Sequence, residues 1–315
     1  MKQQIQLSDH FTYKKLLQFT FPSIIMMIFT SIYSVVDGWF VSNYVGKTQF
    51  AAVNLIMPVL GILGIFGYMF GAGGSALIAK TLGEQERDKA NRLFSLFVYL
   101  SIVVSTIMMI FGFIYLPDVA HWLGAEGQLL EDCNTYGRLF IIALPAWMLL
   151  FEFQLFFVTA EKPKLGLYIT IAAGVTNIIL DALFIIVFDW GISGAAIASA
   201  IGQTVGGVFP LIYFSRKNTS LQKLTRTSFD GKAIIKCCTN GSSELMSGVS
   251  MSILGMVYNY QLLKYAGENG VAAFGVIMYV SMIFIATFLG YCSGVAPIFG
   301  YHYGAHNSLE LKGLL

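Results

Sequence analysis

Long apolar segments, each long enough to cross a membrane as a helix, recur along this chain and constrain its fold more than any other feature. A helix needs about 20 apolar residues to span a bilayer. Only 11% of the residues are charged, whereas soluble domains carry about 25%, and the mean hydropathy is +0.70. The apolar segments are 15–42, 50–79, 93–116, 138–160, 165–188, 193–215, 234–263 and 271–300. We therefore expect an all-α polytopic protein with about eight transmembrane helices in a lipid bilayer.

The basic residues predict how these helices are oriented. Of the 19 Lys and Arg residues, all but Lys47, Arg138 and Lys264 lie in the N-terminal stretch, in alternate turns or in the tail. Basic residues accumulate on the cytoplasmic side, so we expect a multi-pass protein of the plasma (inner) membrane with a cytoplasmic N-terminus. Residues 1–14 form an amphipathic N-terminal stretch. It is either a surface helix capped by Ser8 or Asp9 or a disordered tail.

A repeat divides the chain into two lobes. The 14 residues from Tyr44 return from Tyr265 with six identities, and the offset of 221 residues also relates Gly73 to Gly294 and Gly83 to Gly304. Six predicted spans lie between the copies, so both copies enter the membrane from the same side, as in parallel-repeat transporters.

The repeat also sets the domain boundaries. We expect an N-lobe of six helices at 15–215, a cytoplasmic linker at 216–233, and the first two helices of a C-lobe at 234–315. A complete second copy needs about four more spans. We therefore expect the isolated chain to be inactive in transport, because alternating access uses two lobes.

Four acids, and no Lys or Arg, lie within the predicted spans: Asp37, Glu152, Asp181 and Glu244. An unpaired carboxylate in a membrane costs several kcal/mol, so such acids face a cavity or a partner. The compensating charge must be a proton, a metal cation or a cationic substrate. For Glu244, near the start of its span, an interfacial carboxylate is the alternative.

Asp37 and Asp181 both lie in the outer halves of outward-running spans. Asn177 precedes Asp181 by four residues and so shares its helix face. Two carboxyl groups and a carboxamide at similar depth suit H⁺ or Na⁺ as a coupling ion. The alternative is a pair of protonated, hydrogen-bonded structural acids.

Other kinds of chemistry lack support in the sequence. A net charge of +2 gives no basis for nucleic-acid binding, and four cysteines show no CxxC spacing. No nucleophile elbow, zinc-protease, Walker or dinucleotide motif occurs, so we expect no catalytic residues and no cofactor. His302 and His306 have metal-like spacing but lack a third ligand, so we interpret them as an interfacial pair rather than a metal site.

Several segments together resemble the multidrug and toxic compound extrusion (MATE) transporters, over essentially all 315 residues. The segments are FPSIIMMIFTSIYSVVDGWFVSNYVG, GSALIAKTLGEQERDKANRLF, YITIAAGVTNIILDALFI, GISGAAIASAIGQ and APIFGYHYGAHN. The resemblance implies a twelve-helix fold in two six-helix lobes around a central cleft, and a monomer in full-length form. It also implies export of drug-like, often cationic compounds against H⁺ or Na⁺ entry.

The resemblance also assigns roles to single residues. Asp37, Asn177 and Asp181 match acids and an amide of the family's N-lobe site, and Ser199 matches a hydroxyl that completes it. Tyr136 and Gln154 match polar cleft positions, although Gln154 replaces a more typical Asn. Glu152 lies beside Gln154, and we assign it to the same substrate cleft. Pro22 matches a proline of the first helix, which predicts a hinge coupled to the charge state of Asp37.

Three other functions were weighed against a cation-coupled multidrug antiporter. A flippase for a lipid-linked saccharide precursor would need Arg or Lys in its cleft to bind pyrophosphate, and these spans hold only acids. An intramembrane enzyme would need a nucleophile, a base or a metal constellation. A structural or assembly factor would not need buried acids.

Overall fold

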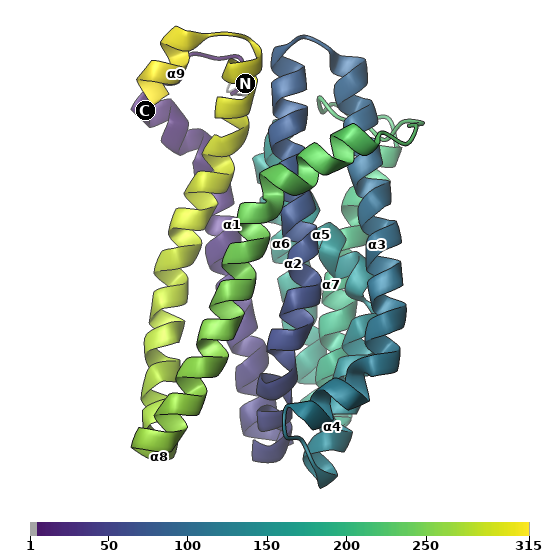
Figure 1. Cartoon of the computed structure of the whole chain (residues 1–315), viewed down its shortest axis with the longest axis vertical. Helices are drawn as coiled ribbons and strands as arrows, with labels where there is room; N and C mark the ends of the chain where they lie inside the picture. Colours follow the sequence, from purple (N-terminus) through teal and green to yellow (C-terminus); the bar gives the residue numbers. More distant parts are fainter. Residues whose placement is uncertain (1–4, 315) are drawn as a thin grey trace.

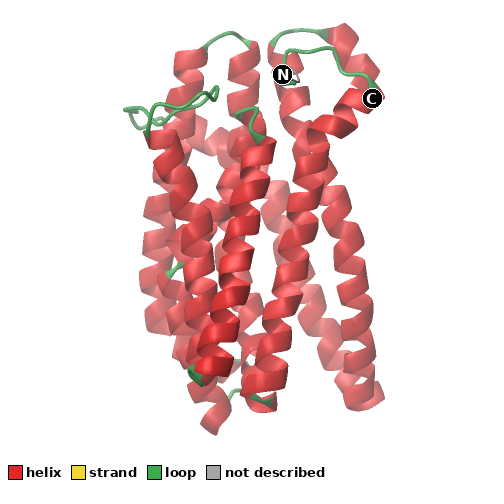
Figure 2. Ribbon diagram, turned by 180° about the vertical axis from the view of Figure 1, so that it is seen from behind, coloured by secondary structure: helices red, strands yellow, loops and turns green. Residues whose placement is uncertain are grey.

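The chain folds into a bundle of long helices, described for residues 5–314 by a computed structural model. The description leaves out the side chains of residues 256, 259, 260, 262–264, 266–276 and 278–280. The elements are α1 (Tyr13–Phe40), the π-helix η1 (Val41–Val45), α2 (Lys47–Gly83), α3 (Arg87–Trp122), α4 (Gly127–Ile142), α5 (Leu144–Thr159), α6 (Pro163–Asp181), the π-helix η2 (Ala182–Val187), α7 (Gly191–Ser215), α8 (Gly231–Gly304) and α9 (Ser308–Leu314). Figure 2 shows only helices joined by loops, which confirms the predicted all-α membrane fold.

Within the described residues, six helical segments are long and apolar enough to cross a membrane. They are α1 with η1, α2, α3, α6 with η2, α7, and residues 281–304 of α8. The predicted span 138–160 is broken, because α4 and α5 meet at an angle of 57°. Pro145 is in the first turn of α5. It has no N–H to donate to the preceding turn, so the helix bends there. Counting this bent pair as one span gives seven.

The last two predicted spans both lie within α8. A straight helix of 74 residues would be about 111 Å long, far more than the roughly 30 Å of a bilayer core. Figure 1 shows two limbs instead, with the chain returning toward its starting end. We call the part after Gly231 the first limb and the part leading to Gly304 the second limb. The predicted span 234–263 and the second copy of the repeat, 265–278, include side chains outside the described set.

Close packing of α8 follows the 221-residue offset of the sequence repeat. Gly73 of α2 lies against the backbone of Gly241 in the first limb, and Gly294 in the second limb lies against Thr20 of α1. Adding 221 to the first residue of each pair, or subtracting it from the second, interconverts the two contacts. The same relation connects the pairs Gly83 with Tyr301 and Gly304 with Lys80. Glycine is required at these contacts because a Cβ would strike the neighbouring helix.

The N-terminal segment is not helical before α1, so the predicted caps at Ser8 and Asp9 are wrong. Thr12 caps α1, with its hydroxyl accepting a hydrogen bond from the Lys15 N–H at 3.4 Å. Asp9 instead accepts from the Gln6 N–H at 3.0 Å and pairs with the Lys15 ammonium at 2.9 Å.

Carboxylates from distant parts of the chain hold this segment extended. The Leu7 N–H donates to Glu161 Oε1 at 2.6 Å, and the Phe11 N–H donates to Glu310 Oε1 at 2.7 Å. His10 Nδ1 lies 2.7 Å from Glu310 Oε2. These backbone donors are therefore occupied by side chains rather than by helical carbonyl groups.

The linker predicted at 216–233 is non-helical up to Asp230. Its backbone is bound to α3: the Lys223 N–H donates to Asn91 Oδ1 at 3.0 Å and the Thr225 N–H donates to Ser95 Oγ at 2.8 Å. The Asp230 carboxylate then caps α8 by accepting from the N–H groups of its first turn, as helix N-caps do.

Candidate functional site

Polar side chains from α1, α6 and α7 meet inside the bundle. Asp37 lies in the last turn of α1, Asp181 ends α6, and Asn177 precedes it by one turn. Ser199 comes from α7, which packs along α6. The four residues predicted for the coupling ion are therefore brought together, from segments up to 162 residues apart.

A chain of hydrogen bonds connects three of them. Asn177 Nδ2 donates to Ser199 Oγ at 3.3 Å, and Ser199 Oγ donates to Asp37 Oδ1 at 3.5 Å. Asp181 is fully buried and close enough to Asp37 for the two carboxyl groups to interact. Among the described residues, no hydrogen-bond donor reaches either oxygen of Asp181 or Oδ1 of Asn177. The site therefore presents buried oxygen acceptors that the described groups leave unsatisfied.

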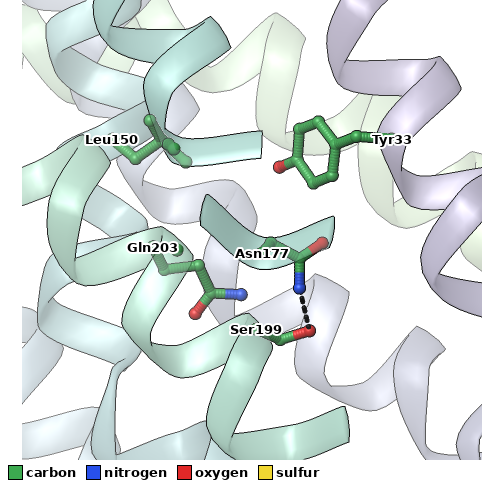
Figure 3. Close-up of a pocket in the computed structure, with 7 residues that line it drawn as sticks. Tyr33, Leu150, Asn177, Ser199 and Gln203 are labelled. Carbon is green, nitrogen blue, oxygen red and sulfur yellow. Dashed lines mark hydrogen bonds between the residues drawn. The ribbon is translucent and has the colours of Figure 1, made fainter. Parts of the chain in front are cut away.

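A cavity of about 20 Å³ adjoins this network. Figure 3 shows Tyr33, Asn177, Ser199 and Gln203 around it, and its lining also includes Leu150, Ala173 and Gly202. This volume is sufficient for about one water molecule, and so for a single small ion. Gly202 allows α7 to approach α6 closely here, because a Cβ would lie 2.9 Å from the Asn177 Cβ.

Tyr33 and Gln203 were not predicted as site residues. Tyr33 lies four residues before Asp37, and Gln203 lies four residues after Ser199. One helical turn separates each from a residue already singled out, so the i, i±4 rule would have found both. The Gln203 carbonyl oxygen is buried and accepts no hydrogen bond from the described residues.

The chemistry of the site follows from its charges. Burying an ionised carboxylate without a partner is strongly unfavourable, and the four ion pairs found among the described residues involve neither acid. Bound protons or a hard cation would supply the missing positive charge, since carboxylate, amide and hydroxyl oxygens suit such cations. The described residues contain no group of three His, Cys, Asp or Glu side chains able to hold a metal.

Both acids precede π-helical turns. η1 starts four residues after Asp37, and η2 starts directly after Asp181. In these segments the Gly46 N–H bonds to the Val41 carbonyl, and the Phe188 N–H bonds to the Leu183 carbonyl, each five residues back. Such turns are rare and are often found at functional sites.

The residues predicted for the cleft are buried. Tyr136 has no exposed surface, donates to Met57 Sδ at 3.9 Å and lies near Ser199. Gln154 donates to Thr170 Oγ1 at 3.5 Å. Glu152 is fully buried, and no donor among the described residues reaches either of its oxygens.

The remaining candidates lie elsewhere. Pro22 is buried within α1, 15 residues before Asp37. Glu244 is partly buried in the first limb of α8. His302 is buried against Phe11, whereas His306 lies in the turn after α8. The two histidines therefore do not share a continuous helix.

Comparisons with known proteins agree with this architecture. The family model described as MatE matches residues 22–183 and 245–314. The multidrug export protein MepA of Staphylococcus saprophyticus is 26% identical over 292 residues, which cover 92% of this chain and 64% of the relative. MepA of Staphylococcus haemolyticus is also 26% identical, over 95% of this chain and 66% of its own length. The chain thus spans just under two thirds of these relatives.

Solved structures show the same fold. A crystal structure of MATE in complex with MaL6 superimposes with a TM-score of 0.91 at 24% identity, over 99% of this chain and 70% of the other. An outward-facing conformation of a multidrug resistance MATE family transporter of the MOP superfamily gives a TM-score of 0.90 at 24% identity, over 99% and 69%.

Proposed function

This chain belongs to the MatE family, and from that premise we propose that the protein is a secondary transporter that exports lipophilic cations in exchange for H⁺ or Na⁺. Relatives are named as multidrug export proteins. One observation carries the proposal furthest: Asp37 and Asp181 adjoin an oxygen-lined cavity, and no described cation pairs with them.

The proposed mechanism uses the charge of these two acids. A cation entering from outside neutralises them and shifts the balance between outward- and inward-facing states. The shift weakens the grip on a lipophilic cation in the cleft. It can be no larger than the difference in the cation's affinity for the two states.

Other residues have supporting roles in the proposal. Asn177 and Ser199 orient the ion, Tyr136, Gln154 and Glu152 border the substrate cleft, and Pro22 acts as a hinge in α1. The protein acts as a monomer in the plasma (inner) membrane, with its N-terminus in the cytoplasm. No catalytic step or cofactor takes part.

The test compares two acid-to-amide variants of the protein expressed from its own gene in drug-sensitive cells. Asp37→Asn removes the ionisable group of the site, whereas Asp118→Asn changes an exposed acid near the far end of α3. We expect wild type and Asp118→Asn to confer resistance to ethidium, and Asp37→Asn to confer none at equal expression. Unchanged efflux by Asp37→Asn would rule out the coupling role of Asp37.

Everted vesicles identify the ion. A pH gradient alone and a Na⁺ gradient alone are applied to the same preparation, and ethidium movement is followed by fluorescence. The gradient that drives transport identifies the coupling ion. Transport driven by neither gradient would exclude cation-coupled antiport of this dye.

A further inference from the structure

Glu152 is a buried acid that points away from the cavity beside Asp37. Leu150 lines that cavity, and Glu152 lies two residues later, about 200° around the α5 helix. The Glu152 side chain has no exposed surface, and its polar neighbour is Ser101 of α3. The Ser101 hydroxyl is itself buried without a partner among the described residues.

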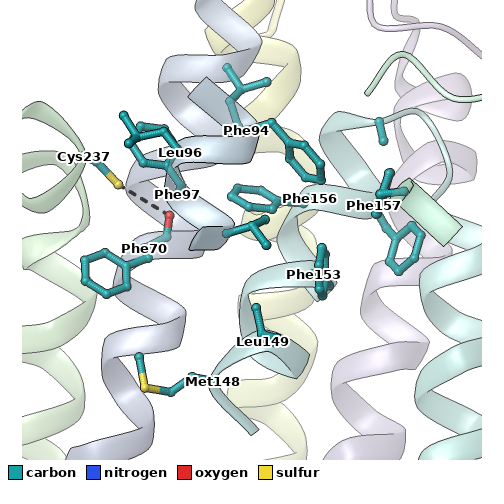
Figure 4. Packing of buried hydrophobic residues seen from close by; sticks show 14 of the residues in the cluster. Phe70, Phe94, Leu96, Phe97, Met148, Leu149, Phe153, Phe156, Phe157 and Cys237 are labelled. Atoms are coloured by element: carbon teal, nitrogen blue, oxygen red, sulfur yellow. Dashed lines mark hydrogen bonds between the residues drawn. The ribbon is translucent and has the colours of Figure 1, made fainter. Parts of the chain in front are cut away.

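An apolar cluster surrounds this acid. Figure 4 shows Phe153 and Phe156 of α5 with Phe97 of α3, Phe70 of α2 and Cys237 of α8. Cys237 lies near enough to Glu152 to feel its charge, and its thiol donates to the Phe70 carbonyl oxygen at 3.6 Å.

No described cation reaches Glu152 from the helices packed around α5. The four ion pairs of the described chain exclude it. The titratable groups on these helices are Tyr68, Lys80 and Glu84 near or on α2, Lys89 and Arg92 on α3, Asp132 and Arg138 on α4, Lys164 and Tyr168 on α6, Tyr213 on α7, and Lys236, Cys237, Cys238 and Glu244 on α8.

A carboxylate in this environment would lack water, a donor and a counter-charge. Such a group costs several kcal/mol and takes up a proton instead. We propose that Glu152 is a second proton-binding site, separate from Asp37 and Asp181, that holds its proton while the first limb of α8 covers it and releases it to water when that limb moves away. The inference rests on the proposed transport function, because the movement is that of two lobes.

The cover over Glu152 is suited to opening as a unit. The first limb meets α2 through backbone contacts: Gly73 lies against Cys237, and Gly241 lies against Met69. Contacts between small residues hold helices close without interlocking long side chains. The limb can therefore separate without rearranging the apolar cluster, and water then reaches the carboxyl group.

Infrared spectroscopy of the purified protein tests the proton directly and needs no transport. The spectrum of Glu152→Gln is subtracted from that of wild type at neutral pH, with Glu126→Gln, an exposed acid, as the control. We expect the Glu152 difference to contain the carbonyl band of a protonated carboxyl group and the Glu126 difference to lack it. Absence of the band from the Glu152 difference overturns the proposal.

A wedge variant tests the release. Gly241→Leu forces the first limb away from α2, whereas Gly255→Leu enters open space on the same helix. We expect the Glu152 band to be lost in Gly241→Leu and kept in Gly255→Leu; a band kept in both overturns the release step. Should Gly241→Leu not fold, Ser101→Ala serves instead, and an unshifted Glu152 band there overturns the environment assigned to the acid. Failure of the transport proposal is distinct, since it appears as unchanged efflux by Asp37→Asn while the Glu152 band persists.

Discussion

Replacing Gly67 of α2 with alanine tests how tightly α2 packs on α5. A Cβ at Gly67 would lie 2.6 Å from the Met148 Cα and 2.8 Å from the Met148 carbonyl carbon. Ordinary contact begins at 3.4 Å, so the helix backbones must separate by the difference, about 0.8 Å. A backbone cannot swing aside as the end of a side chain can, and two packed helices must move instead.

The size of the effect follows from two opposing terms. Alanine in a helix is more favourable than glycine by about 0.5–1 kcal/mol, whereas overpacking a well-packed interior costs about 1–3 kcal/mol. We expect Gly67→Ala to be destabilised by about 1–2 kcal/mol. For a chain of this size, that lowers the Tm by roughly 2–8 °C.

A second glycine of α2 provides the control. A Cβ at Gly61 would have no heavy atom within 4 Å, so Gly61→Ala should keep or raise the Tm. Thermal unfolding in detergent can be followed through tryptophan fluorescence, since Trp147 packs against Gly64 in the same interface. Equal Tm values for Gly67→Ala and Gly61→Ala would refute the backbone contact.

Two further predictions concern contacts outside this interface. The Tyr68 hydroxyl lies 3.0 Å from Ser293 Oγ and connects α2 to the second limb of α8. Tyr68→Phe should cost about 1 kcal/mol, and adding Ser293→Ala should cost little more; fully additive losses in a double-mutant cycle would contradict a shared hydrogen bond. Burial raises the pKa of Glu310, but the Phe11 N–H and His10 outweigh it and lower that pKa below its ordinary value of 4.5. The contact therefore stabilises the fold above pH 4.5 and is lost as pH falls through the lowered pKa, so the Tm difference between wild type and Glu310→Gln should shrink in acid; a difference constant with pH would exclude this linkage.

The apolar periodicity of the sequence was sufficient to predict the long helices but not their breaks. Residues 138–160 are apolar throughout, and a proline near the start of a helix is compatible with a straight helix that begins there. The bend before Pro145 depends on how α4 and α5 each pack against α2 and α7. The N-terminal segment was mispredicted for a related reason, because the carboxylates that hold it belong to Glu161 and Glu310, far away in the sequence.

The candidate site was predictable as far as helix faces allow. Asn177 and Asp181 share a face by spacing alone, and the cost of buried charge singles out Asp37. That Ser199 donates to Asp37 depends on the register between α1 and α7, which no local pattern encodes. The position of Glu152, turned toward Ser101, likewise depends on how α5 is rotated against α3.

The π-helical turns after Asp37 and Asp181 separate two geometric requirements. A π turn amounts to one extra residue within an α-helix, and one residue corresponds to about 100° of rotation. Each acid can therefore face its neighbours on α6 or α7 while the end of its own helix faces a different direction. Shortening 41–45 or 182–187 by one residue would remove this independence, so that the carboxyl group and the adjoining loop could no longer both keep their present directions.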